Sequence, residues 1–320
     1  MKRKHPDPEL GGTGESAAEP IDLPRQQAGS QPQLLLLTLF VDYWLGRTEH
    51  LPSAALVALL GEFGVSPAGG RAALSRLARR NLLASEKRGR RTYYRLSPTS
   101  DEFLDWRTGE TLRSGLGSKP WDGRWTAIAY SIPDDQRQAR GPLRNRLRSL
   151  GFAALYDGLW ISPHPPPRAL YDALEALEDA SVTVFVAESL DRRDGSDPVE
   201  AWDLTHLREA YDEFVARFGP LRDRVVAGEV GTAEALVART EIMNYWRQLA
   251  RLDPELPIEL LGDDWPRADA RKLFVAVYDA LGPLAEVRFA AILRDHDPDL
   301  ADLVSHFTSD RFLETHPASR

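Results

Sequence analysis

The stretch GVSPAGGRAALSRLARRNLL, Gly64–Leu83, decides the fold of the N-terminal part of this 320-residue chain. Ser66 can cap a helix that has Pro67 in its first position and runs to about Asn81. A short glycine-containing turn separates this helix from another one predicted over 53–63. Two helices joined by so short a turn indicate a helix-turn-helix. The inward face of the second helix is expected to consist of Ala73, Leu74, Leu77 and Ala78.

The flanking sequence completes a winged module. An apolar stretch before the two helices, Gln33–Leu45, predicts a further buried helix that ends at Gly46. After them, two strand-like runs surround a basic turn in which Gly89 suits a hairpin. The two runs are Leu82–Glu86 and Thr92–Leu96. With Pro98 closing the module, the sequence predicts a winged helix-turn-helix between about Gln33 and Pro98.

Charge is distributed unevenly along the chain, whose net charge is −8. The segment 66–96 carries nine basic side chains and one acidic side chain, a net charge of +8, whereas 201–320 has a net charge of −8. A basic module on an acidic body concentrates positive potential where a polyanion can dock. A winged helix used for protein contacts is the alternative, but the charge density favours DNA.

The predicted DNA-binding residues follow from this geometry, because the major groove of B-DNA admits one α-helix. The second helix of the pair is expected to read bases, its end to contact phosphates, and the hairpin to grip the backbone or minor groove. The residues expected to bind DNA are Ser66, Arg71, Ser75, Arg76, Arg79, Arg80, Lys87, Arg88, Arg90, Arg91 and Tyr93.

The central part of the sequence alternates strands and helices. A strand over Trp125–Ile132 precedes a helix over Gln136–Leu150, and a second helix is expected over Pro167–Leu177. A hairpin and a last strand complete the order β-α-β-β-α-β, which is the ferredoxin-like arrangement. The hairpin strands are Phe152–Tyr156 and Leu159–Ser162, and the last strand is Val182–Val186.

The C-terminal part is predicted to be all-helical. Its clearest helices are Leu204–Phe218, Ala233–Leu252 and Ala268–Leu281. The expected fold class is therefore α+β, multidomain. Its parts are a disordered tail over 1–32, the winged helix-turn-helix with a linker over 33–114, a ferredoxin-like domain over 118–190 and an all-α domain over 198–320.

A catalytic site is not evident in this sequence. The histidines show no metal-ligand spacing, and no nucleophile elbow, Walker A motif or dinucleotide fingerprint occurs. The segment AYSIPDD resembles the first strand of the ferredoxin-like metal-dependent nucleases of CRISPR adaptation, which need an Asp near the strand end to hold the ion. Asp134 and Asp135 follow this strand, but Ser131 occupies that position, so Asp134 is expected to start the helix or to lie in its turn. We therefore expect neither enzyme activity nor a cofactor or metal, with the nuclease kept as the alternative.

Composition indicates the compartment. Cysteine is absent, which excludes disulfides and suits a reducing compartment. No apolar run approaches the roughly 20 residues that a spanning helix needs, and no apolar stretch follows the basic N-terminus as a signal peptide would require. A cytoplasmic protein without membrane contact is expected.

Two further patterns suit a small ligand. Four arginines spaced by three and four residues form a stripe on the predicted helix 136–150, where they can hold phosphates; a solvated face is the commoner use of such a stripe. They are Arg137, Arg140, Arg144 and Arg148. The aromatic residues of the helical part can wall an apolar pocket, although core packing is their commoner use. They are Tyr211, Tyr245, Trp246 and Trp265.

Five motifs together resemble the PaaX family of phenylacetic-acid-catabolism repressors. They cover about residues 33–300. The motifs are DYWLGR at Asp42–Arg47, GVSPAGGRAALSRLARRNLL at Gly64–Leu83, WDGRW at Trp121–Trp125, GFAALYDGLWISP at Gly151–Pro163 and LDPELPIELLGDDWP at Leu252–Pro266.

The resemblance implies a GntR-like winged helix, a ferredoxin-like central domain and a helical C-terminal domain. It also implies a homodimer that binds an imperfect palindrome in double-stranded DNA as a repressor. The resemblance also implies release from DNA by an acyl-CoA effector such as phenylacetyl-CoA. The motifs do not show which residues bind this effector. We hypothesise that Arg137, Arg140, Arg144 and Arg148 bind the phosphates of this effector and that Trp246 contacts its acyl group, in a pocket between the second and third domains.

Overall fold

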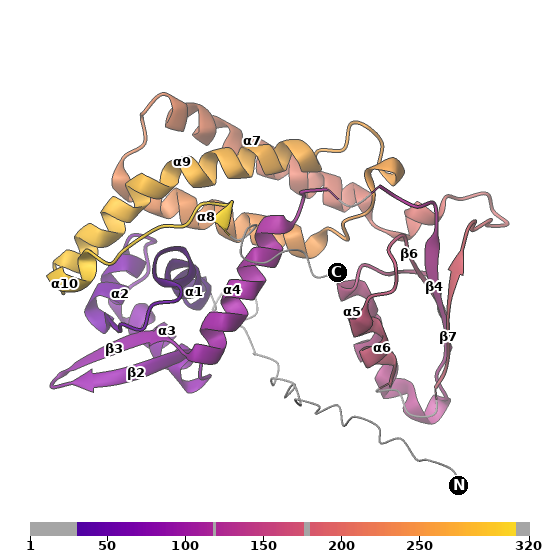
Figure 1. Cartoon of the computed structure of the whole chain (residues 1–320), viewed down its shortest axis with the longest axis horizontal. Coiled ribbons are helices and arrows are strands. Elements are labelled where there is room, and N and C mark those ends of the chain that lie inside the picture. The colour runs from indigo at the N-terminus through magenta and orange to yellow at the C-terminus, as the bar shows by residue number, and fades with distance from the viewer. Residues whose placement is uncertain (1–30, 118–119, 176–179, 312–320) are drawn as a thin grey trace, which may run out of the picture.

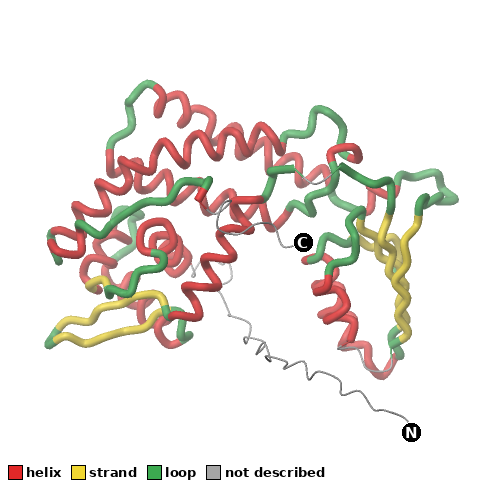
Figure 2. The backbone as a smooth tube through the Cα atoms, in the orientation of Figure 1, coloured by secondary structure: helices red, strands yellow, loops and turns green. Residues whose placement is uncertain are grey.

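The computed structural model describes residues 31–117, 120–175 and 180–311. Figure 1 shows an N-terminal unit and a central unit on opposite sides of the molecule, with long C-terminal helices running across the N-terminal unit. Strands are confined to these two units, as Figure 2 shows. The tail predicted over 1–32 lies outside the described residues except for Gln31 and Pro32, which open the first helix.

Three helices and a hairpin build the N-terminal unit. They are α1 (Gln31–Trp44), α2 (Ser53–Gly61), α3 (Pro67–Arg79), β2 (Leu83–Arg88) and β3 (Arg91–Leu96). The Ser66 hydroxyl accepts a hydrogen bond from the Gly69 N–H, and Pro67 opens α3, as the sequence predicts. A two-residue strand that the sequence analysis missed, β1 (Leu51–Pro52), pairs with β3 and gives the sheet order β1-β3-β2.

Pro98, expected to close this unit, instead opens helix α4 (Pro98–Arg113). The Ser97 hydroxyl accepts from the Ser100 N–H, and Pro98 takes a first-turn position, where the N–H that proline lacks has no intrahelical partner. Helix α4 therefore follows directly after the hairpin.

The central unit contains β4 (Trp125–Ser131), α5 (Arg140–Ser149), β5 (Ala153–Tyr156), β6 (Leu159–Ser162), α6 (Arg168–Glu175) and β7 (Ser181–Ala187). Its sheet has the order β5-β6-β4-β7 with antiparallel pairing between all neighbours, which is the ferredoxin-like arrangement expected. Ile128 and Trp160 of the sheet pack against Leu143, Leu147 and Leu170 of the two helices.

The helix predicted over 136–150 is wrong in its first turn. Asp134–Ala139 forms a 3₁₀ helix, η1, and the α-helix begins only at Arg140. Pro142 explains the boundary, because a proline is tolerated in the first turn of an α-helix but would break a hydrogen bond further inside it.

Long helices dominate the C-terminal part: α7 (Leu204–Val226), α8 (Thr232–Leu252) and α9 (Arg267–Arg294), followed by the short α10 (Pro298–Ala301). The short 3₁₀ helices η2 (Pro198–Ala201) and η3 (Ile258–Leu260) lie in the connections before α7 and after α8. Two of the long helices continue through Gly-Pro pairs at which their ends were expected, 219–220 and 282–283. Beyond the second pair, Ala285 and Phe289 remain fully buried, so core packing supports the continuation of α9. No helix in the described part of the chain is long and apolar enough to cross a membrane.

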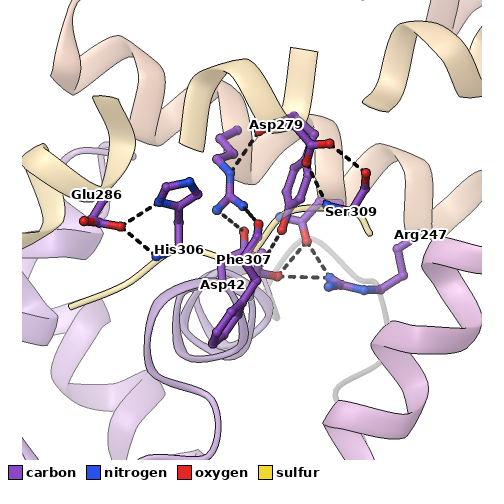
Figure 3. A network of polar contacts seen from close by, with 11 residues as sticks. Asp42, Arg247, Asp279, Glu286, His306, Phe307 and Ser309 are labelled. Atoms are coloured by element: carbon purple, nitrogen blue, oxygen red, sulfur yellow. Dashed lines mark hydrogen bonds and ion pairs between the residues drawn. The ribbon is translucent and has the colours of Figure 1, made fainter. Parts of the chain in front are cut away.

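The N-terminal and C-terminal helices share one hydrophobic core. Helix α1 is buried along nearly its whole length, and its Tyr43 ring lies 4.8 Å from the Phe289 ring of α9. A buried polar network joins the same parts. Figure 3 shows Asp42 of α1 close to the C-terminal segment that carries Phe307, with Arg247 of α8 reaching toward the same region. The N-terminal helices therefore rest on the C-terminal helices.

Candidate nucleic-acid interface

Helix α3 presents a basic face. Gly70, Ala73, Leu74 and Leu77 are buried, which leaves the opposite face to solvent. Arg71, Ser75, Arg79 and Arg80 are exposed there, and Arg76 is half-buried. Ser66 is exposed but its hydroxyl is used as the helix cap. The predicted base-reading side chains thus lie on the solvent face of a well-anchored helix.

The hairpin adds cations beside this helix. Lys87, Arg88, Arg90 and Arg91 are all exposed around the turn at Gly89, whose φ of 62° suits glycine. Because α3 packs against β2, the two basic groups belong to one surface. Figure 1 shows the hairpin projecting away from the body of the molecule.

Arg88 is held back from the tip of the hairpin. Its guanidinium donates to both carboxylate oxygens of Glu86, at 3.0 and 2.9 Å, and lies 4.7 Å from the centre of the Tyr93 ring. The hydrogen bond from Arg88 keeps the pKa of Glu86 below its usual value. Tyr93 is only 8 % exposed, so it packs inward and supports Arg88. Lys87, Arg90 and Arg91 are therefore the hairpin cations best placed to meet a phosphate.

One neighbour of the hairpin was missed by sequence reasoning. His50 lies 3.6 Å from Glu86 through Nδ1, and burial lowers the pKa of its ring. It comes from the segment between α1 and β1, 36 positions before Glu86 in the sequence. No local pattern marks such a contact, because it depends on the pairing of β1 with β3.

The four arginines predicted to bind effector phosphates do not converge. Arg137 lies in η1, outside the α-helix that carries the other three. Arg140 donates to the Ile132 carbonyl at 2.8 Å, and Arg144 pairs with Asp157 at 2.8 Å. Arg148 lies 5.4 Å from the centre of the Trp160 ring and borders a cleft against the segment 250–255.

Trp246, the predicted contact of the acyl group, is fully buried. Its ring stacks on Phe274 at 4.8 Å, and its Nε1–H donates to the Thr111 carbonyl at 3.1 Å. This position does not suit a pocket wall. The tryptophan instead fastens the end of α4 to the C-terminal helices.

The motif segment 252–266 forms the joint between the central unit and the C-terminal helices. Asp253 is buried, accepts two hydrogen bonds from Arg267 at 2.7 and 2.9 Å, and accepts the Tyr211 hydroxyl at 2.6 Å. Leu256 packs in a cluster with Trp125 of β4. Part of the family-like signature therefore serves the joint between these two units.

The residues at the end of β4, where the nuclease alternative would place a metal ion, give little support to such a site. Ser131 is exposed at the end of β4, and Asp135 is exposed in η1. Within the described ranges, no three His, Asp or Glu residues are grouped closely enough to hold a metal ion.

Three family models match successive parts of the chain. "PaaX-like protein" matches residues 31–100, "PaaX protein central Cas2-like domain" matches 118–199, and "PaaX-like protein C-terminal domain" matches 202–291.

A curated relative and a solved structure are also similar to the chain. The transcriptional repressor PaaX of Escherichia coli (strain K12) is 28 % identical over 261 residues, which cover 78 % of this chain and 80 % of that protein. The solved structure is the uncharacterized protein Rv0674 from Mycobacterium tuberculosis. It superposes with a TM-score of 0.55 at 22 % identity and covers 82 % of this chain and 98 % of that one, a likeness of fold alone.

Proposed function

Because the chain belongs to the PaaX family of transcriptional regulators, we propose that it represses transcription through a winged helix-turn-helix formed by about residues 33–114. The ferredoxin-like unit, about 118–190, and the helical part, about 198–320, complete the protein. The observation that carries the proposal is the exposed arginine face of α3 beside the basic hairpin β2–β3. No comparison supports the nuclease alternative.

The two basic groups divide the work of recognition. Arg71, Ser75 and Arg76 of α3 read base edges in the major groove, where arginine forms paired hydrogen bonds to guanine. Arg79 and Arg80 at the end of α3 contact phosphates. Lys87, Arg90 and Arg91 contact the backbone beside the groove that α3 enters, and Arg88 joins them if a phosphate replaces its Glu86 partner.

The regulator acts as a homodimer on a palindromic operator. Helix-turn-helix dimers bind two half-sites about one helical turn apart, so a twofold protein matches a twofold DNA site. The operon is one for phenylacetate-type catabolism, and an acyl-CoA such as phenylacetyl-CoA releases the repressor. Release requires this effector to bind the DNA-free form more tightly than the DNA-bound form.

Fluorescence anisotropy with operator and random DNA tests the division of roles. Arg71→Ala/Arg76→Ala should abolish the preference for operator, since each lost base contact costs about 1–3 kcal/mol. Arg90→Ala/Arg91→Ala should weaken binding to both DNAs and lower the salt slope by about one unit per lost phosphate contact. The matched control Arg193→Ala/Arg222→Ala removes two exposed arginines elsewhere. It should change neither the preference for operator nor the salt slope. Unchanged affinity in both test variants would refute the assignment.

A further inference from the structure

A cavity lies where helices α1, α4 and α8 meet, beneath the helix-turn-helix. Its apolar wall is formed by Leu34, Leu37 and Val41 of α1 and Leu104 of α4. The cavity itself holds about 90 Å³ and is partly open to solvent, so a ligand larger than a small apolar group has to extend through its mouth.

Three guanidinium groups occupy the other side of this cavity. They belong to Arg107 of α4 and to Arg247 and Arg251 of α8. The lining contains no carboxylate, and Glu110, whose charge acts on Arg107, is already paired with Arg113. Burial and the nearby Arg251 charge lower the pKa of Arg107. The cavity thus combines an apolar wall with three guanidinium groups, and the carboxylates that act on them, Glu110 on Arg107 and Asp42 on Arg247, lie outside its lining.

Arg247 is positioned for a ligand by two neighbours. One of its terminal nitrogens donates to the Thr38 hydroxyl at 3.0 Å and to the Asn244 side-chain oxygen at 2.8 Å. The Thr38 hydroxyl in turn donates to Asn244 at 2.9 Å. These contacts fix one edge of the guanidinium. A side chain held in this way loses little conformational entropy when it binds an anion.

A second, wider cleft continues from the first and shares Arg107 and Arg251 with it. On its far side lie Arg148 of α5 and the turn at Gly151 in the central unit, and on its near side lies the joint segment 252–255. Three carboxylates also line this cleft, and each has a partner: Asp253 pairs with Arg267, Glu255 accepts the Gly115 N–H at 3.1 Å, and Asp203 caps α7. Arg107 and Arg251 therefore lie between a small, partly open apolar cavity and a wider cleft bordered by a third arginine.

We propose that the α1–α4–α8 cavity binds the apolar part of an amphipathic organic anion, with its carboxylate or phosphate held by Arg107, Arg247 and Arg251. This inference rests on the proposed function, because it assigns a site to the effector. Two sources share this chemistry: a free aryl carboxylate, which the cavity holds alone, and a thioester of coenzyme A, whose phosphates extend into the cleft toward Arg148.

The site is placed to act on DNA binding. Helix α1 packs against α2 and α3, and α4 follows directly after the hairpin. Both line the cavity opposite α8, so a bound anion ties the supports of the DNA-binding elements to the C-terminal helices. The ligand changes operator affinity to the extent that these supports differ between the free and DNA-bound forms.

Titration calorimetry on the full chain tests the site with three probes: phenylacetate, phenylacetyl-CoA and coenzyme A. We expect one or both phenylacetyl compounds to bind more tightly than coenzyme A. Arg107→Ala/Arg251→Ala should weaken that binding at least about tenfold, since hydrogen bonds to charged groups are worth about 1.5–3 kcal/mol each. The control Arg193→Ala/Arg222→Ala should bind as the unmodified chain does.

The outcomes separate the two sources and the two proposals. Tight binding of phenylacetate places the carboxylate at the three arginines, and binding of the thioester alone, weakened further by Arg148→Ala, places phosphates in the cleft. Equal binding of coenzyme A and its thioester, binding of no probe, or unchanged affinity in Arg107→Ala/Arg251→Ala overturns the site. Without ligand, the operator affinity of Arg107→Ala/Arg251→Ala should stay within about twofold of that of the unmodified chain, which shows that the variant folds. If the unmodified chain itself does not bind operator, the proposed function is refuted instead.

Discussion

Asp42→Ala should destabilise the chain strongly, because this carboxylate is buried next to positive charge. Asp42 is 1 % exposed, accepts the Tyr278 hydroxyl at 3.0 Å and lies 3.6 Å from Arg239, which is fully buried in α8. Removing one partner of a buried ion pair leaves the other charge uncompensated and costs about 3–5 kcal/mol. We expect a loss of this size in the free energy of unfolding.

Urea unfolding monitored by circular dichroism measures this loss. Asp269→Ala is the matched control: Asp269 pairs with Lys272 at 3.0 Å, but both side chains are about four-fifths exposed, and such pairs contribute about 0–1 kcal/mol. The double variant Asp42→Ala/Arg239→Met should lose less than the sum of its single changes, since it removes both charges. A loss below about 1 kcal/mol in Asp42→Ala would refute the electrostatic role of this pair.

Two other predictions concern the helix α9 and the joint. Gly282→Ala should destabilise the protein by about 1–3 kcal/mol, because an added Cβ would collide with the His306 ring. Gly219→Ala is the control: this glycine also precedes a proline inside a helix, but it has open space around it, so the change should stabilise the protein slightly. Equal effects of the two changes in thermal unfolding would contradict this reasoning. Burial lowers the pKa of His164, so the stability it contributes is present above its unfolded pKa of about 6.5 and lost as pH falls through the lower folded value. The free energy of unfolding should fall more steeply between pH 7.5 and pH 5 for the unmodified chain than for His164→Gln. Parallel dependences on pH in the two proteins would contradict this role of His164.

Local sequence determined the elements that depend on nearest neighbours. Ser66 and Pro67 start α3 through a cap and a fixed backbone angle, and Gly89 permits the hairpin turn. The alternation of strands and helices between residues 125 and 186 likewise predicted the ferredoxin-like order. These signals act over a few residues, so they can be recognised without knowing what packs against the element.

Tertiary structure decided the rest, because burial and charge pairing depend on residues far apart in the chain. Sequence reasoning treated Trp246 as a pocket wall and the 137–148 arginines as one stripe, whereas packing buries the tryptophan and the arginines turn to separate partners, Arg140 to the Ile132 carbonyl and Arg144 to Asp157. The three arginines that meet at the α1–α4–α8 cavity are separated by up to 144 positions in the chain. Only the shared core, in which α1 packs against the C-terminal helices, brings them together.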